Sequence, residues 1–357
     1  MTVNYNKTPW PWFGGKADAS TAVWEALGDV DHYVEPFAGS LAVLLRRPHE
    51  ANRTYHSETV NDLDGLLVNA WRSMQLSPDA MAEAASWPVS EADLHARHVA
   101  LVRWKAEHEL EHLMGDPAWH DPVMAGWWAW GQSSWIGSGW CSGLGGWTAD
   151  ADGRLVRAPG SGGVSRKLPF LTSDGRGTNR PQLREPGVDD GAEFHPVTMP
   201  ELRRWFLYLS ARLRHVRILN GDWKRAVTNG ASKTLPVRHG GHVGIFLDPP
   251  YSAAAGRAEV YTEEDLEVAH ACREWALVRG RDTDTRIVLA GFEGEGHEVL
   301  LASGWREVEW FRKGFLTGGM GNTAKGEKTH QQGRERLWLS PACLAPVDPE
   351  KQGGFGW

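Results

Sequence analysis

Strand-like and helix-like segments alternate along this chain, first over residues 16–75 and again from residue 199 onward. Apolar residues spaced three or four apart predict helices at 16–27, 40–47, 63–75, 201–213 and 261–279. Short apolar runs predict strands at 32–35, 55–60, 216–219, 243–247, 286–290, 306–311 and 336–340. Such alternation is typical of an α/β fold, in which helices cover the faces of a mostly parallel sheet.

Residues 80–198 interrupt this alternation. Residues 78–114 are charged and helical in pattern, with Ser90-Glu91-Ala92-Asp93 as a capping box. Residues 148–196 are rich in Gly, Pro, Arg, Ser and Thr, and a stretch this long without either period is usually functional or disordered. We therefore expect a discontinuous α/β domain (1–79 and 199–345), a helical and loop-rich insertion (80–198) and a disordered tail (346–357).

Composition narrows the class of protein. The 357 residues contain no apolar run long enough to span a membrane, and the first residues lack the pattern of a secretion signal. Cys141, Cys272 and Cys343 are widely spaced, which argues against a disulfide framework and a Cys-based zinc site. We therefore expect a reduced, cytoplasmic protein without a membrane partner.

The net charge of −7 is unevenly distributed. Between residues 154 and 184, seven basic residues stand against one acid, Asp174, and between 311 and 336 six stand against Glu327 and Glu335. Both stretches are glycine-rich, which predicts loops of concentrated positive charge. A single such loop is commonly just solvated, but two in an acidic chain favour a polyanionic partner.

The tetrad Asp248-Pro249-Pro250-Tyr251 directly follows the predicted strand at 243–247. Two prolines remove two backbone donors and stiffen the chain, which would make a rigid loop at the carboxyl end of the strand. Open α/β sheets bind their ligands at that end. A tight structural turn would explain Asp-Pro but not the whole tetrad.

This tetrad resembles the catalytic loop of amino-methyltransferases that act on DNA bases. Three more segments are similar to the Dam-like adenine-N6 family, which includes phage members: Pro11-Trp12-Phe13-Gly14-Gly15-Lys16, Tyr33-Val34-Glu35-Pro36-Phe37-Ala38-Gly39-Ser40 and Val60-Asn61-Asp62. They resemble, in turn, the N-terminal cofactor motif, the first strand with its cofactor loop, and the acidic end of the second strand. The order of segments is also that of the family, and the resemblance covers roughly residues 8–76 and 199–340.

The resemblance implies a Rossmann-like class I methyltransferase fold with a target-recognition insertion, and transfer of a methyl group to adenine N6. The donor would be S-adenosylmethionine, the product S-adenosylhomocysteine, and the target an adenine flipped out of double-stranded DNA, with no metal required. A monomer would suffice, and the sequence does not separate a lone modifier from the partner of a restriction endonuclease. The catalytic residues would be Asp248, Pro249, Pro250 and Tyr251. The cofactor-binding residues would be Trp12, Phe13, Gly14, Gly15, Lys16, Glu35, Pro36, Phe37, Ala38, Gly39, Ser40, Asn61, Asp62, Asp222 and Asp248.

Some cofactor residues also have a physical interpretation. The loop 37–40 would bring backbone close to a ligand at a helix N-terminus, where the helix dipole favours a carboxylate. Asp62 would accept both ribose hydroxyls or cap the helix predicted from residue 63, and Asp222 would lie near adenine or cap a helix. Lys16 would place a cation near the cofactor carboxylate or the catalytic loop, and Trp12 would pack on the cofactor. The family usually has a second glycine where this chain has Leu41, so we expect a tighter loop or a shifted cofactor.

The tryptophan-rich segment and the basic loops are candidates for DNA contact. Trp127, Trp128 and Trp130 have near-helical spacing, which favours the core of the insertion. Trp135 and Trp140 flank a polar, glycine-containing stretch and are better placed to touch DNA. The predicted DNA-contacting residues are Trp135, Trp140, Arg166, Lys167, Arg176, Arg180 and Arg257.

Three alternatives stay open at this point. The tetrad chemistry suits any exocyclic base amine, including cytosine N4, although the Gly-Gly-Lys motif and the motif order favour adenine. Leu41 admits a DNA-binding module that holds the cofactor without transferring its methyl group. His108-Glu109-Leu110-Glu111-His112 matches the His-Glu-x-x-His pattern of zinc hydrolases, with Glu109 as base, in a segment predicted to be helical. A charged helix face is the simpler explanation of that match.

Overall fold

The computed structural model describes residues 5–10, 12, 14–48, 57–108, 119–135, 140–141, 147–149, 155–157, 199–232, 241–250, 263–310 and 335–345. The chain divides into two compact units. Unit 1 consists of Met1–Gly15, Gly39–Leu45 and Asp62–Gly221, and unit 2 of Lys16–Ala38, Arg46–Asn61 and Asp222–Trp357. The boundaries of the insertion at residues 80 and 198 stay a prediction.

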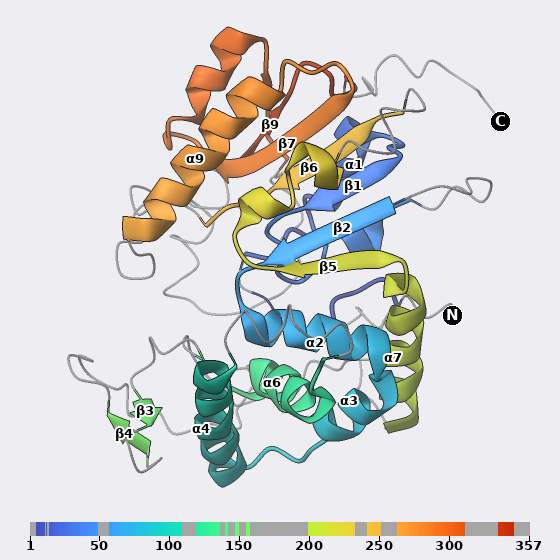
Figure 1. Cartoon of the computed structure of the whole chain (residues 1–357), viewed down its shortest axis with the longest axis vertical. Helices are drawn as coiled ribbons and strands as arrows, with labels where there is room; N and C mark the ends of the chain where they lie inside the picture. The colour runs from blue at the N-terminus through green and yellow to red at the C-terminus, as the bar shows by residue number, and fades with distance from the viewer. Residues whose placement is uncertain are drawn as a thin grey trace, which may run out of the picture. The chain divides into compact units, whose positions relative to one another are not determined.

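A seven-stranded sheet has the strand order β5-β2-β1-β6-β7-β9-β8 (Figure 1). Its strands are β1 (His32–Glu35), β2 (Ser57–Asp62), β5 (Val216–Asn220), β6 (Val243–Leu247), β7 (Thr285–Phe292), β8 (Arg306–Val308) and β9 (Glu335–Leu339). β1 is parallel to β2 and β6, and β6 is parallel to β7. β9 lies between β7 and β8 and runs antiparallel to both. The prediction of an α/β fold with a mostly parallel sheet is therefore confirmed.

The central strands β1 and β6 are buried along their whole length. Helix α1 (Ser20–Leu27) packs against β6 and β7, and helix α9 (Glu263–Arg279) packs against β7. A strand covered on both faces is a continuous apolar run rather than an alternating one. β6 has this character, and β1 carries polar residues only at its ends, His32 and Glu35; both strands were predicted from sequence with their observed bounds.

Unit 1 contains most of the described helices. They are α2 (Gly65–Leu76), α3 (Pro78–Ala85), α4 (Glu91–Glu107), α6 (Pro122–Ser134) and α7 (Met199–Leu213). Of the three tryptophans predicted to form core, Trp128 and Trp130 are fully buried and Trp127 is half-buried. Ser90 caps α4 by accepting a hydrogen bond from Asp93 N, as the capping-box pattern indicated. Strands β3 (Trp147–Ala149) and β4 (Leu155–Arg157) form a separate antiparallel pair.

Short helical elements complete the described chain. They are η1 (Leu44–Arg46), η2 (Trp223–Arg225), α8 (Asn229–Ser232) and η5 (His297–Ser303). All three cysteines are buried and unpaired, and burial raises the pKa of each thiol. Among the helices of the described residues, none combines the length and apolar character needed to cross a membrane.

Four local predictions were wrong. The helix predicted at 16–27 begins at Ser20, and turns precede it. The predicted helix at 40–47 is a series of turns that ends in η1, because Leu41 has a left-handed backbone conformation with φ of 54°. The helix after β2 begins at Gly65, since Asp64, not Asp62, accepts the capping hydrogen bond from Leu66 N. The strand predicted at 306–311 ends at Val308.

Candidate active site

Asp248 follows β6 directly and forms an ion pair with a residue of the N-terminal motif. Lys16 Nζ lies 3.1 Å from Asp248 Oδ1, and the two side chains are 5% and 18% exposed. A buried ammonium group needs a partner of opposite charge, so this contact also fixes the direction of the carboxylate. Of the two places expected for Lys16, the structure shows the one beside the tetrad. Pro249 is buried and Pro250 half-buried, whereas Tyr251 lies outside the described residues.

The loop after β1 is held by the end of β2, within unit 2. Asn61 Nδ2 donates to the carbonyl of Pro36 at 3.0 Å, and Ala38 N donates to the carbonyl of Asn61 at 2.8 Å. Asn61 was predicted to bind the cofactor. That role stays a prediction; in the structure, its amide nitrogen fixes the loop that carries Phe37 and Ala38. Glu35, the last residue of β1, is buried and accepts a hydrogen bond from Tyr33 Oη.

In unit 1, Asp62 holds the next residue of the same loop. Its Oδ2 accepts a hydrogen bond from Gly39 N at 3.0 Å, and its Oδ1 accepts one from Asp64 N at 3.0 Å. Burial raises the pKa of Asp62 to about 6, and these backbone hydrogen bonds oppose part of that rise. Trp71 Nε1 donates to the carbonyl of Gly39 at 3.0 Å. Both backbone groups of Gly39 are therefore fixed.

Gly39 must be glycine for two reasons. Its φ is +46°, and a Cβ added there would lie 2.7 Å from Trp12 Nε1. Trp12 itself packs near Trp128, with 6.1 Å between ring centroids, and its carbonyl accepts a hydrogen bond from Gly15 N. The N-terminal motif thus forms a turn against the loop within unit 1, and Trp12 covers the loop backbone. Phe13 of this motif lies outside the described residues.

Leu41 keeps the backbone conformation that a glycine would favour. Its φ of 54° is left-handed, while its side chain is completely buried. The position where the resembled family usually has glycine therefore combines a strained backbone with a core side chain. Ser40, the residue before it, is buried, and its carbonyl accepts a hydrogen bond from Thr8 Oγ1 at 2.8 Å.

Asp222 is exposed and caps η2, where its Oδ1 accepts a hydrogen bond from Lys224 N at 2.8 Å. Of the two roles predicted for Asp222, the structure therefore shows the capping of a helix. The next residue, Trp223, lies 6.0 Å from Phe37 between ring centroids. Within unit 2, this contact connects the loop after β1 to the segment around Asp222.

Three residues beside the predicted site residues received no role from the sequence: Leu63, Tyr33 and Trp71. Leu63 follows Asp62 and is 68% exposed, although it is apolar. Tyr33 lies inside a quoted motif but received no role, and Trp71 was treated as an ordinary helix residue. An apolar residue directly after a strand-end acid is a signal that could have identified Leu63. Nothing in the local pattern identifies Trp71, because its partner Gly39 is 32 positions away.

Trp140 cannot serve as the predicted DNA contact. It is only 8% exposed, its Nε1 donates to the carbonyl of Trp128 at 3.1 Å, and its ring fills the space above Gly131. Trp135 is half-buried and stacks on His98 at 5.1 Å, and its contact with DNA stays a prediction. The predicted contacts Arg166, Lys167, Arg176, Arg180 and Arg257 lie outside the described residues.

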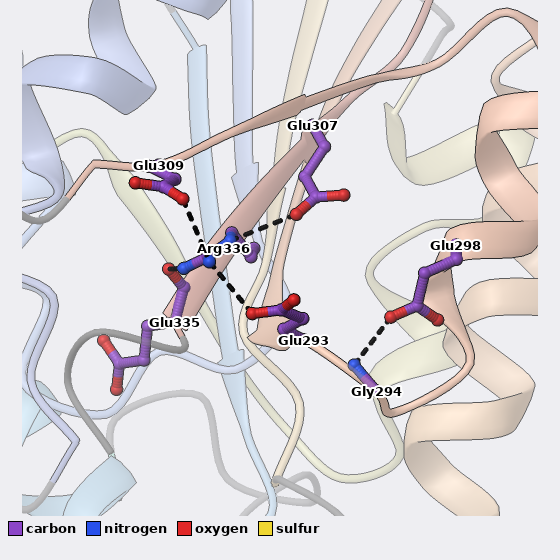
Figure 2. A network of polar contacts seen from close by, with 7 residues as sticks. All are labelled: Glu293, Gly294, Glu298, Glu307, Glu309, Glu335 and Arg336. Carbon is purple, nitrogen blue, oxygen red and sulfur yellow. Dashed lines mark hydrogen bonds and ion pairs between the residues drawn. The ribbon is translucent and has the colours of Figure 1, made fainter. Parts of the chain in front are cut away.

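Arg336, the last basic residue of the run at 311–336, is enclosed by carboxylates (Figure 2). Its Nη2 lies 2.9 Å from Glu293 and 3.1 Å from Glu309, and its Nε lies 3.1 Å from Glu307. The Arg336 side chain is 9% exposed. Arg336 therefore joins the ends of β7, β8 and β9, and it does not present its charge to a phosphate.

The first histidine of the zinc-hydrolase pattern lies at the end of helix α4 and not within it. Helix α4 ends at Glu107, and His108 is its C-cap residue with φ of −113° and ψ of 79°. The ring of His108 stacks on Trp104, and its Nδ1 lies 2.8 Å from the carbonyl of that residue. The pattern requires both histidines on one helix face, and this helix stops before the first of them. Glu109 and His112 lie outside the described residues.

Carboxylates therefore end three strands of the sheet: Glu35 on β1, Asp62 on β2 and Asp248 after β6. Such groups accept hydrogen bonds from ammonium, hydroxyl and amine donors. Neither the protein-family models nor the curated proteins compared with the chain contain a significant match to it.

Proposed function

We propose that this protein transfers a methyl group from S-adenosylmethionine to N6 of adenine in DNA. The observation that carries the proposal is the ion pair of Lys16 with Asp248, at 3.1 Å. It joins the N-terminal motif to the tetrad at the carboxyl end of β6, where α/β sheets bind ligands. The strand order, with reversed β9 between β7 and β8, is compatible with the class I methyltransferase fold that the resemblance implies.

Features of each unit suit S-adenosylmethionine. Gly39 lets Trp12 lie against its main chain, because a Cβ there would come 2.7 Å from Trp12 Nε1, and this indole is the ring expected to pack on the cofactor. Glu35 offers a carboxylate to the ammonium of the methionine moiety, and Asp62 offers one to the ribose hydroxyls. The exposed apolar side chain of Leu63 would pack on adenine. When bound, the cofactor would supply an electrophilic methyl group on its sulfonium.

The tetrad would act on the amine of the target base. That amine is a weak nucleophile because its lone pair is delocalised into the ring. The Asp248 carboxylate and the Pro249 carbonyl would accept its two N–H groups and draw the nitrogen towards tetrahedral geometry, which releases the lone pair. Lys16 would hold Asp248 in the required direction, and Tyr251 would stack on the flipped base. Most of the rate gain would come from positioning.

The test is methyl transfer from labelled S-adenosylmethionine to unmethylated DNA, followed by digestion to nucleosides and mass spectrometry. We expect N6-methyladenine from the wild type and none from Asp248→Ala. Asp79→Ala, which removes an exposed aspartate, is the matched control and should keep full activity. If the product is N4-methylcytosine, the target base is cytosine and not adenine, while the proposed chemistry of the tetrad stands. Cofactor binding without any methylated base would overturn the enzymatic proposal in favour of a silent binding module.

A further inference from the structure

A tyrosine hydroxyl bonds to the carboxylate at the end of β1. Tyr33 Oη donates to Glu35 Oε2 at 3.1 Å, and both residues are buried within unit 2. They are two positions apart on one strand, so their side chains point to the same face of the sheet. The ring of Tyr33 is fixed by Trp24 of α1, with 4.7 Å between ring centroids.

A second buried acid lies on this face with its own cation. Glu58 of β2 pairs in register with Tyr33, and its Oε1 lies 3.0 Å from Arg47 Nη1. Arg47 also donates to the carbonyl of Val30, and its guanidinium lies 5.4 Å from the Trp24 ring. The Arg47 guanidinium is thus engaged by Glu58, while the Tyr33 hydroxyl serves Glu35.

The hydroxyl of Tyr33 is a permanent donor in this environment. Burial, followed by the charge and hydrogen bond of Glu35, raises the pKa of Tyr33 well above its ordinary value. The O–H therefore keeps its proton at any physiological pH. A phenylalanine would fill the same space against Trp24, so packing alone does not require the hydroxyl.

We propose that Tyr33 is a positioning residue, whose hydroxyl fixes the Glu35 carboxylate in the orientation that receives the ammonium group of the methionine moiety. This inference rests on the proposed function. Tyr33 acts through Glu35 and does not touch the cofactor. Because a carboxylate held in advance loses less rotational freedom on binding, the hydroxyl contributes to affinity for the amino-acid half of the ligand only.

The test compares two ligands on wild type and Tyr33→Phe by isothermal titration calorimetry. S-adenosylhomocysteine carries the amino acid, whereas 5′-methylthioadenosine has the nucleoside thioether without it. We expect Tyr33→Phe to raise the Kd of S-adenosylhomocysteine roughly tenfold, the range for a hydrogen bond to a charged group. The Kd of 5′-methylthioadenosine should not change. In the transfer assay KM for the cofactor should rise while kcat is kept.

Thr59→Val is the matched control. It removes another buried hydroxyl from β2, one that lies 3.1 Å from His32 Nε2 on the opposite face of the same two strands. This variant should bind both ligands like the wild type. The double variant Tyr33→Phe/Glu35→Gln should bind S-adenosylhomocysteine no more weakly than Glu35→Gln alone, since the hydroxyl acts through that carboxylate.

The outcomes separate this inference from the function on which it rests. Unchanged affinity of Tyr33→Phe for S-adenosylhomocysteine would overturn the positioning role and leave the proposed function standing. An equal loss of affinity for both ligands would assign Tyr33 a purely structural role and overturn it as well. A wild type that binds neither ligand would refute the proposed function itself.

Discussion

Leu41 allows a direct test of backbone strain in the loop after β1. Its φ is 54° and its side chain is completely buried. Truncation to alanine removes the buried side chain, at a cost of about 2–5 kcal/mol in the free energy of unfolding, and keeps the left-handed backbone. Truncation to glycine also removes Cβ, which relieves strain of about 1–2 kcal/mol. We therefore expect Leu41→Gly to be more stable than Leu41→Ala by about 1 kcal/mol.

This order is the reverse of the usual one, and a helix position supplies the control. Leu67 is fully buried within α2, where glycine is about 1 kcal/mol less favourable than alanine. Urea denaturation followed by circular dichroism gives the free energies of unfolding of all four variants. The free energy of unfolding of the glycine variant minus that of the alanine variant should be positive at position 41 and negative at position 67. The same sign at both would refute the argument that Leu41 is strained.

Four further predictions concern charged groups. Ribose hydroxyls would donate to the ionised form of Asp62, whose pKa is about 6, so cofactor affinity should fall as the pH drops below 6. Proton release near that pH, measured by calorimetry in two buffers of different ionisation enthalpy, should be absent in Asp62→Asn. Because the same pKa lies above its ordinary 3.8, the folded state binds the proton more tightly, and the contribution of Asp62 to stability should decline as the pH rises from 3.8 to about 6. Arg336→Met should lower the free energy of unfolding by about 1–2 kcal/mol, because the three carboxylates around it then repel one another. Urea denaturation repeated at high salt should show a smaller difference in this free energy between variant and wild type, since salt screens the repulsion. Lys16→Met should lower kcat about 100-fold with little change in cofactor KM, because it leaves Asp248 without the ammonium that orients it; an unchanged kcat would contradict that role.

Sequence reasoning succeeded where a segment's own composition decides its structure. β1 and β6 were predicted with their observed bounds: β6 contains no polar side chain, as is typical of a strand buried on both faces, and β1 has polar residues only at its ends. The amphipathic helix α7 was predicted to within two residues, since its buried side chains recur at helical spacing.

Local reasoning failed where a distant contact decides. Both Asp62 and Asp64 are suitable helix caps, and the choice between them depends on Gly39 N, which lies 23 positions from Asp62 and engages its carboxylate. Trp140 follows a glycine-serine stretch, a pattern that predicts exposure. Its ring is buried in the structure because Gly131 has no side chain and leaves space for the ring. In the predicted helix at 40–47, leucine favours helix intrinsically, and the left-handed backbone at Leu41 overrides that preference.

The topology explains why two carboxylates can serve separate steps. β1 and β6 are adjacent and parallel, with Val34 paired to Ile245. Glu35, the last residue of β1, and Asp248, the residue after β6, therefore lie at the carboxyl ends of neighbouring strands. Tyr33 acts on the first carboxylate and Lys16 on the second, through different contacts. If the first governs cofactor affinity and the second the chemical step, the effects of Tyr33→Phe and Lys16→Met on kcat/KM should multiply in the double variant. A double variant no worse than Lys16→Met alone would show instead that both residues support one event, and that cofactor binding and activation of the amine are not separable in this site.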